Sequence, residues 1–275
     1  GDIGNHVIRE LKQNHTVVIA DLKEPKDLSE VEYKKVNLLD SAETKKIIRN
    51  VDAVIHLAAI PDSFTEPGDK IIHVNMVSTY NVLEAVKENN IPKIIYGGSD
   101  SATGFGIRNV QYKPLYLPLD GNHPCWPHES YSLSKYFGEE MCREYARAYG
   151  IQVLSIRFVW VLVERNRAAI EAIREGDSNF YDWLGAYVMP QDIAGILAKA
   201  VAYEPQNDNN FPFEIFYAHA RNTYLKIPTL DQAKKIWGSL PETVDWDYYK
   251  ENPYAPFFNI RNSREKLGFL PQYHI

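Results

Sequence analysis

A tyrosine and a lysine stand four residues apart at Tyr131 and Lys135, inside a run with the composition of a helix. Residues four apart lie on one face of a helix, one turn from each other. An ammonium group near a phenol favours the phenolate and lowers the pKa of the phenol from its usual value of about 10. Tyr131 is therefore a candidate proton donor and acceptor, and Lys135 could also reach a bound hydroxyl group. Ordinary helix faces have the same spacing, so the pair alone leaves a structural role open.

Three polar side chains, Ser99, Asp100 and Ser101, follow the apolar run 91–96 and two glycines. The run has the length and composition of a buried strand. Hydroxyl groups at the carboxyl end of a parallel strand lie where open α/β sheets bind their ligands. The sequence therefore predicts that these three residues contact a substrate. A surface turn is the alternative for either serine.

The first residues, Gly1-Asp2-Ile3-Gly4, precede an amphipathic run. Backbone N–H groups at a helix start can bind a phosphate, and glycine allows the ligand to come close. Asp21 ends a short β-branched run, and in dinucleotide-binding units an acidic residue about 20 positions after the glycines holds the ribose hydroxyls. We therefore predict a cofactor site at Gly1, Ile3, Gly4 and Asp21. A flexible start and a solvated aspartate are the alternatives.

Strand-like and helix-like segments alternate along the chain. Expected strands are 16–21, 33–38, 53–59, 91–96, 150–158 and 213–218; expected helices include 41–50, with Ser41 as its N-cap, and 70–89. The run 53–59 is almost wholly apolar, as in a strand buried on both faces of a parallel sheet. This alternation predicts an α/β fold with a doubly wound parallel sheet of the Rossmann type and right-handed crossovers.

The order of these features resembles the extended short-chain dehydrogenase/reductase family, and within it the NAD-dependent sugar epimerase/dehydratase group with its uronate-dehydrogenase-like members. The resemblance covers nearly the whole chain. The residues that carry it are Gly1-x-x-Gly4, Asp21, His56-Leu57-Ala58-Ala59, Asn75, Ser99, Tyr131-x-x-x-Lys135 and the tail 258–269, which closes on Leu267-Gly268-Phe269.

The resemblance implies a catalytic set of Ser99, Tyr131 and Lys135, with Ser101 as the alternative serine. It also implies that Asn75 supports the backbone of the active site. The cofactor-binding set that it implies is Gly1, Ile3, Gly4, Asp21, Asn37, Leu38, Leu57, Ala58, Ala59, Asn75, Tyr131 and Lys135. Residues 1–158 would form the NAD-binding domain. Residues 159–275 would combine a small C-terminal substrate-binding subdomain with late elements of the core.

Three departures from the family pattern bear on the substrate. Gly98-Ser99 replaces a pair of serines, and an apolar run, 159–163, replaces an Asn/Gly/Pro turn that receives a sugar nucleotide in the family. Arg165, Arg167 and the loop around Trp183 are candidate substrate contacts, with a structural role as the alternative. Asp192 is expected to cap a helix.

The chain begins inside the family's Gly-x-x-Gly-x-x-Gly loop, which normally follows a central strand. Removing a central strand would leave ladder hydrogen bonds unmade. We therefore expect about ten residues, including that strand, before Gly1.

Composition narrows the classes of partner. The chain has 275 residues, a net charge of −6 and no basic cluster, which argues against nucleic acid. No apolar run is long enough for a membrane span. The two cysteines, Cys125 and Cys142, show no metal spacing, so we predict no metal and a reducing, cytoplasmic setting. The resemblance implies a homodimer.

Together these features predict an NAD-dependent oxidoreductase that oxidises a hydroxyl of a small sugar or sugar acid. One alternative is a nucleotide-sugar epimerase or dehydratase; the dehydratase is disfavoured because Ser99-Asp100 stands where a Thr-Asp-Glu run is expected. Two non-catalytic alternatives are an NAD-binding regulatory module and a structural NAD-stabilised subunit. An intact Tyr131/Lys135 pair argues against the regulatory module. NAD is preferred over NADP because Asp21 would oppose a 2′-phosphate.

Overall fold

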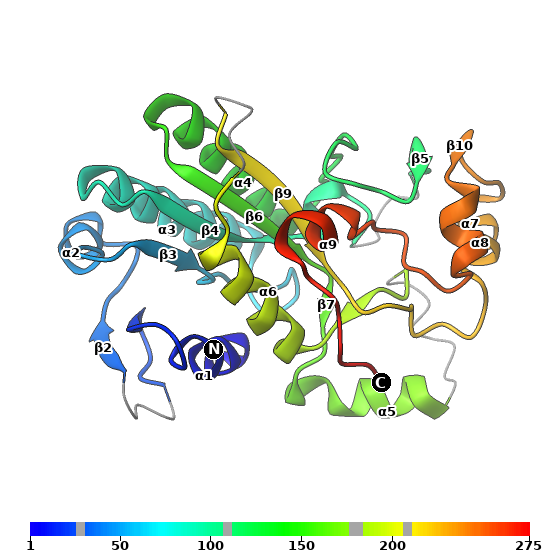
Figure 1. Ribbon diagram of the computed structural model, residues 1–275, viewed down its shortest axis with the longest axis horizontal. Coiled ribbons are helices and arrows are strands. Elements are labelled where there is room, and N and C mark those ends of the chain that lie inside the picture. Colours follow the sequence, from blue (N-terminus) through cyan, green and yellow to red (C-terminus); the bar gives the residue numbers. More distant parts are fainter. Residues whose placement is uncertain (26–30, 107–111, 176–183, 206–210) are drawn as a thin grey trace.

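The structure is a computed structural model that describes residues 1–25, 31–106, 112–175, 184–205 and 211–275 (Figure 1). Within these ranges the side chains of five residues are not described: Arg165, Arg167, Ile170, Ile173 and Arg174.

Four parallel strands form the main sheet, in the order β3-β4-β6-β9 (Figure 1). They are β3 (Ala53–His56), β4 (Lys93–Ser99), β6 (Gln152–Phe158) and β9 (Phe213–Ala218). A separate parallel pair consists of β1 (Val18–Asp21) and β2 (Glu32–Lys35). The predicted α/β fold with parallel strands is therefore confirmed, although the apolar run 53–59 leaves the sheet after His56.

Helices cover both faces of the main sheet because successive strand residues point to opposite sides. Ile94 and Val153 pack with α3 (Gly68–Glu88) and α4 (Ser130–Tyr149). The next residues along each strand, Ile95 and Leu154, pack with α1 (Asp2–Leu11) and α6 (Pro190–Ala202) (Figure 1). Each such buried aliphatic side chain stabilises the fold by about 1.5–3 kcal/mol. Burial on both faces explains why these strands read as continuous apolar runs.

Two predicted helix caps are wrong by one to three residues. The helix α2 (Ser41–Ile47) is capped by Asp40, whose carboxylate accepts the Glu43 N–H, and Ser41 is its first residue. Asp192 lies in the first turn of α6, after the N-cap Met189. Its carboxylate instead accepts the backbone N–H groups of two residues near the C-terminus.

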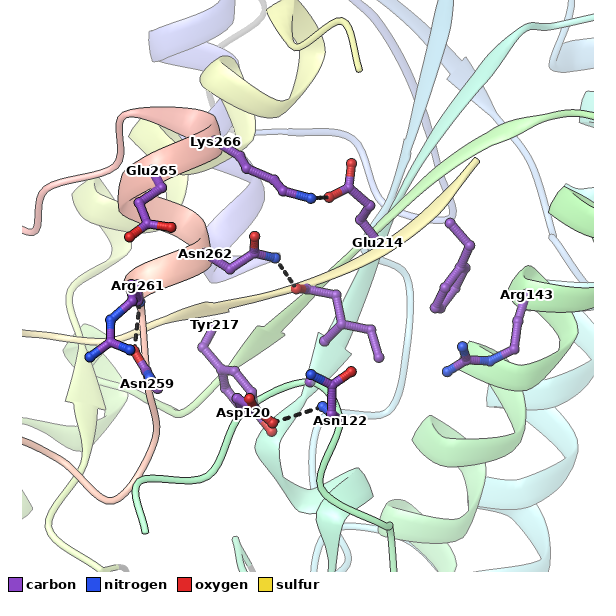
Figure 2. A pocket seen from close by; sticks show the side chains of 13 residues that line it. Asp120, Asn122, Arg143, Glu214, Tyr217, Asn259, Arg261, Asn262, Glu265 and Lys266 are labelled. Atoms are coloured by element: carbon purple, nitrogen blue, oxygen red, sulfur yellow. Dashed lines mark hydrogen bonds and ion pairs between the residues drawn. The ribbon is translucent and has the colours of Figure 1, made fainter. Parts of the chain in front are cut away.

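The outer edge of β9 is covered by α9 (Arg261–Leu267). Asn262 donates its amide to the carbonyl oxygen of Ile215 at 2.9 Å (Figure 2), and the Ser263 hydroxyl donates to that of Tyr217 at 2.7 Å. These side chains satisfy two carbonyl groups that no neighbouring strand could reach.

The remaining elements are short and lie mostly in the second half of the chain. They are η1 (Asp100–Thr103), β5 (Tyr116–Leu117), β7 (Trp160–Val161), η2 (Glu164–Asn166), α5 (Arg167–Glu175), β8 (Tyr187–Val188), α7 (Thr229–Trp237), β10 (Thr243–Val244) and α8 (Trp246–Glu251). Within the described ranges, no helix is both long and apolar enough to cross a membrane.

Candidate active site

The carboxyl end of β4 places Ser99, Asp100 and Ser101 together in a buried position. Ser99 has an extended backbone and caps η1, so its hydroxyl accepts the Ser101 N–H at 3.1 Å. Glycine at position 98 has a packing reason, because a Cβ there would lie 2.8 Å from the Ser155 hydroxyl oxygen. Close packing against β6 therefore explains why glycine stands at position 98, where the family has the first serine of a pair.

The start of α4 fixes the position of Tyr131. The Glu129 carboxylate accepts the backbone N–H groups of Tyr131 and Ser132, and the Ser132 hydroxyl accepts the Glu129 N–H. This reciprocal pair satisfies donors that a helix start otherwise leaves free. Glu129 and Ser132 were not among the predicted site residues. The signal that could have found them is an acidic N-cap three residues before a serine.

Tyr131 and Lys135 lie one turn apart, with the Lys135 ammonium 5.9 Å from the centre of the Tyr131 ring. The Ser99 side chain lies near the Tyr131 phenol and acts on its pKa. Lys135 donates to the carbonyl oxygen of Gly97 at 2.8 Å. The structure therefore brings together Ser99, Tyr131 and Lys135, the three residues predicted for catalysis.

The predicted lowering of the Tyr131 pKa is wrong for this structure. Burial raises the pKa of Tyr131, and the neighbouring Asp100 raises it further, whereas the nearby Ser99 side chain acts in the opposite direction. Burial also lowers the pKa of Lys135 to about 8. Because the Lys135 ammonium is directed at the Gly97 carbonyl, desolvation outweighs its attraction for a phenolate.

Asn75 holds the site together through three hydrogen bonds. Its amide oxygen accepts the Ile60 N–H at 2.7 Å, and its amide nitrogen donates to the Ile60 carbonyl at 3.1 Å and the Ser134 hydroxyl at 2.9 Å. Ser134 in turn donates to the Tyr131 carbonyl at 2.7 Å. Asn75 thus positions the loop after β3 and the start of α4. Ser134, which sequence reasoning missed, connects the two.

His56 is a buried strand residue. Its Nε2 lies 3.0 Å from the Thr79 hydroxyl oxygen, and that hydroxyl donates to the Asn75 carbonyl at 2.7 Å. Because the Thr79 hydrogen is used, Nε2 acts as the donor in their contact. Burial and the nearby Lys135 charge lower the pKa of His56 to about 3.

The residues predicted to bind the cofactor lie at strand ends and at the start of α1. Asp21 ends β1, and its carboxylate accepts the Lys23 N–H at 2.9 Å. Asn37 and Leu38 follow β2, and Leu57, Ala58 and Ala59 follow β3. Gly1 is the N-cap of α1; Ile3 and Gly4 lie within the helix.

These residues fit a dinucleotide in two respects. Apart from the neighbouring residues and the backbone of α1 itself, no described atom lies within 4 Å of the position a Cβ would take on Gly1 or Gly4, so internal packing does not require glycine there. Ala58 is exposed at the end of β3 and presents little side chain to a ligand. Glycine and alanine have little or no side chain, so a dinucleotide can come close to the protein backbone at these positions.

Two groups of predicted substrate residues are differently placed. Asp100 and Ser101 adjoin Ser99. Arg165 and Arg167 have described backbones in η2 and α5, but their side chains lie outside the described part of the structure, as does all of Trp183.

A buried ion pair that sequence reasoning missed lies behind the site. The Arg157 guanidinium on β6 contacts the Glu139 carboxylate on α4 at 2.5 Å, and each side chain is 1% exposed. Arg157 also donates to the Tyr217 hydroxyl at 2.9 Å, and the Ser155 hydroxyl donates to Glu139 at 2.7 Å. These bonds join the helix that carries Tyr131 to β6 and β9.

A cleft of about 440 Å³ lies beside β9 and α9, apart from the predicted site residues (Figure 2). Its lining contains none of the predicted site residues. The cations around it already have partners: Lys266 with Glu214, Arg143 with Glu140 and Arg261 with Asp245. The chemistry of the buried cluster, and not the volume of this cleft, therefore identifies the candidate site.

Comparison with known proteins places this geometry in a family. A family model described as "NAD dependent epimerase/dehydratase family" matches residues 1–173. A putative UDP-glucose 4-epimerase of Methanocaldococcus jannaschii is 34% identical over 184 residues, which cover 62% of this chain and 57% of that protein. A uronate dehydrogenase of Pseudomonas syringae pv. tomato is 27% identical over 161 residues, covering 57% of this chain and 55% of the relative. The matches thus span little more than half of these relatives.

Solved structures show the same fold. A crystal structure of UDP-galactose 4-epimerase has a TM-score of 0.70 at 22% identity, with 99% of this chain and 91% of that chain covered. A mutated uronate dehydrogenase has a TM-score of 0.67 at 17% identity, with 99% and 78% covered.

The family model matches more than half of the chain and includes Ser99, Tyr131 and Lys135. The predicted resemblance is therefore confirmed: the chain belongs to the NAD dependent epimerase/dehydratase family.

Proposed function

We propose that this protein is an NAD-dependent oxidoreductase that oxidises a hydroxyl of a small sugar or sugar acid. The observation that carries the proposal is the cluster of Ser99, Tyr131 and Lys135 at the carboxyl end of β4, in which Ser99 and Lys135 are buried. The relatives include a uronate dehydrogenase and an L-arabinose 1-dehydrogenase of Haloferax volcanii, the latter 27% identical over 59% of this chain and 64% of that protein.

In the proposed reaction, Tyr131 accepts the proton of the substrate hydroxyl as a general base. Ser99 donates a hydrogen bond to the same oxygen as it becomes a carbonyl. Lys135 lies beside both Tyr131 and Gly97, where its charge favours the phenolate when substrate and cofactor occupy the site. Bound NAD supplies the acceptor for the hydride.

We also propose a division of labour along the chain. Residues 1–158 contain the strand ends predicted for the cofactor and the Ser99–Tyr131–Lys135 cluster. Residues 159–275 add α6 and β9 to the core. They also contain the β7–β8 pair directly after β6, and this segment would form the substrate side.

The cofactor form is proposed to be NAD and not NADP. The Asp21 carboxylate ends β1, where it would meet the 2′-phosphate of NADP at close range. Titration of the full chain with each cofactor tests this assignment. Equal or tighter binding of NADP would show that Asp21 does not contact the ribose.

A free sugar or sugar acid is proposed over a nucleotide sugar. The apolar segment 159–163 follows β6 where a polar turn would be needed for a diphosphate. The specific observation in favour of the second candidate, a nucleotide-sugar epimerase, is the 34% identity to the putative UDP-glucose 4-epimerase.

A screen of NAD reduction with free aldoses, uronates and nucleotide sugars separates the two. NADH formation with an aldose or uronate supports the oxidoreductase. Micromolar calorimetric binding of a uridine-diphosphate sugar that free sugars cannot displace would instead identify the epimerase.

A cytoplasmic homodimer completes the proposal. Both cysteines are unpaired thiols, which suits a reducing compartment. Aromatic side chains on α3 and α4 are exposed, Tyr80 at 47% and Phe137 at 43%. Pairing of two copies through these helices would bury them, and light scattering of Phe137→Glu beside the unmodified protein would test it. A monomer in both samples would contradict the dimer.

A further inference from the structure

The Ser99 hydroxyl has two hydrogen-bonded neighbours and lies near the Tyr131 side chain. It accepts the Ser101 N–H at 3.1 Å and donates to the Asp100 carboxylate at 3.2 Å. Its proximity to Tyr131 shows in its effect on the pKa of that phenol. Ser99 is 5% exposed and Asp100 is 9% exposed, so bulk water does not relieve competition among these partners.

A hydroxyl group has one hydrogen to donate and two lone pairs to accept with. The Ser101 N–H occupies one lone pair. While Asp100 is a carboxylate it can only accept, so it holds the single Ser99 hydrogen and leaves Ser99 an acceptor toward Tyr131. A protonated Asp100 can donate to Ser99, which fills the second lone pair and releases the hydrogen toward Tyr131 and the substrate oxygen.

We propose that Asp100 is a positioning residue whose protonation sets the direction in which the Ser99 hydroxyl donates. The inference rests on the proposed function, in which Ser99 must donate to the oxygen of the substrate. When Asp100 is protonated, the Ser99 hydroxyl can donate its hydrogen to the substrate oxygen. When Asp100 is ionised, the Ser99 hydroxyl donates to Asp100 instead.

The surroundings of Asp100 place its change of protonation near neutral pH. Burial raises the pKa of Asp100 to about 7, against hydrogen bonds from Ser99 and Ser101 and the more distant charge of Arg157. Arg157 cannot neutralise Asp100 directly, because its guanidinium is bound to Glu139. On the α4 side Asp100 faces Tyr131, whose pKa it raises. Asp100 is thus a buried carboxyl group with hydrogen-bond donors, and none of the described residues forms an ion pair with it.

The proposal predicts a falling alkaline limb in the pH profile of kcat. As Asp100 ionises, the Ser99 hydrogen bond to the transition state is lost, and such a bond contributes about 10²–10³ in rate. In Asp100→Asn an amide replaces the titrating group and can donate to Ser99 at every pH. The limb should therefore disappear in Asp100→Asn.

The test compares pH profiles of the full chain, Asp100→Asn, Ser99→Ala and the double variant, with Asp62→Asn as the matched control. The Asp62 charge also raises the pKa of Tyr131, so a purely electrostatic role would make both aspartate variants behave alike. Support requires that Asp100→Asn, and not Asp62→Asn, removes the limb and that its effect is much smaller in the Ser99→Ala background. The same shift in Asp62→Asn, or an equal effect of Asp100→Asn without Ser99, would overturn the proposal.

A readout without substrate separates this inference from the proposed function. Carbon-13 NMR of aspartate carboxyl groups, assigned with Asp100→Asn, should show Asp100 titrating near neutral pH and shifting upward in Ser99→Ala, which removes a donor to the carboxylate. The inference would be overturned if Asp100 titrated as an ordinary carboxyl group, or if its titration were unchanged in Ser99→Ala. This result would count even if the protein oxidised no sugar.

Discussion

The Tyr131 phenol lies between groups that act on its proton in opposite directions. Burial and the Asp100 charge favour the neutral phenol, and the nearby Ser99 side chain favours the phenolate. Lys135 is one turn away on the same helix, but its ammonium is directed at the Gly97 carbonyl. Catalysis at this site therefore requires that ligand binding shift Tyr131 from the phenol toward the phenolate.

Replacing Tyr131 by phenylalanine should lower kcat by about 10²–10⁴, because only the ionisable oxygen is removed. Cofactor affinity, measured by fluorescence titration, should change little. Tyr136→Phe on the same helix is the control and should keep its activity. Full activity in Tyr131→Phe would remove Tyr131 from the mechanism.

The two serines of the site should differ in their effect. The Ser99 side chain acts on the pKa of Tyr131, whereas Ser101 acts on the pKa of Asp100. Ser99→Ala should therefore lower kcat by about 10–10³, with a smaller loss in Ser101→Ala. Steady-state kinetics of both variants decides between them, and a larger loss in Ser101→Ala would transfer the catalytic role to Ser101.

At the scale of elements, α4 is fixed to the sheet by the buried Glu139–Arg157 pair. Removing one member of such a pair leaves an uncompensated buried charge. Arg157→Met should therefore lower the free energy of unfolding by about 3–5 kcal/mol, measured by denaturant titration. Glu139→Leu combined with Arg157→Met should recover part of that loss.

The exposed pair Arg147–Glu144 on the same helix provides the control. Arg147→Met should change the free energy of unfolding by no more than about 1 kcal/mol, as is usual for surface pairs. A loss in Arg157→Met no larger than in this control would mean that the buried pair is not what fixes α4.

The sequence predicts elements well where one local pattern decides them. The apolar runs of β4, β6 and β9 locate buried strands, and the helical period alone brings Tyr131 next to Lys135. Cap positions are less certain because neighbouring oxygen-bearing residues compete, as Asp40 and Ser41 do. The Glu139–Arg157 pair was not predictable, since charged residues read as solvent-facing until the fold brings two distant segments together.

At the scale of the whole molecule, His56 couples stability to pH. Its pKa is lowered from 6.5 to about 3 in the folded chain. The unfolded chain therefore binds a proton at a higher pH than the folded chain, and stability is lost as pH falls below about 6.5. Between pH 7 and pH 4.5 the loss from this residue should be about 2–3 kcal/mol.

Denaturant titrations at the two pH values check this expectation. His56→Gln should show a smaller loss of stability than the unmodified chain, whatever its stability at pH 7. His73→Gln is the control, because His73 is exposed on α3. An unchanged pH dependence in His56→Gln would show that the folded protein accommodates a charged imidazole at this position.

Because α9 covers the outer edge of β9, it also affects whether two copies of the chain can pair through that edge. A strand with free carbonyl and amide groups along one edge can extend its sheet with a strand from another molecule. The seven residues of α9 are attached by the buried side chains of Ser263 and Leu267, followed by Phe269. Detachment of this one short helix would uncover β9 while the rest of the sheet stays folded. Sheet-to-sheet aggregation of this protein should therefore begin from a nearly native molecule, without prior global unfolding.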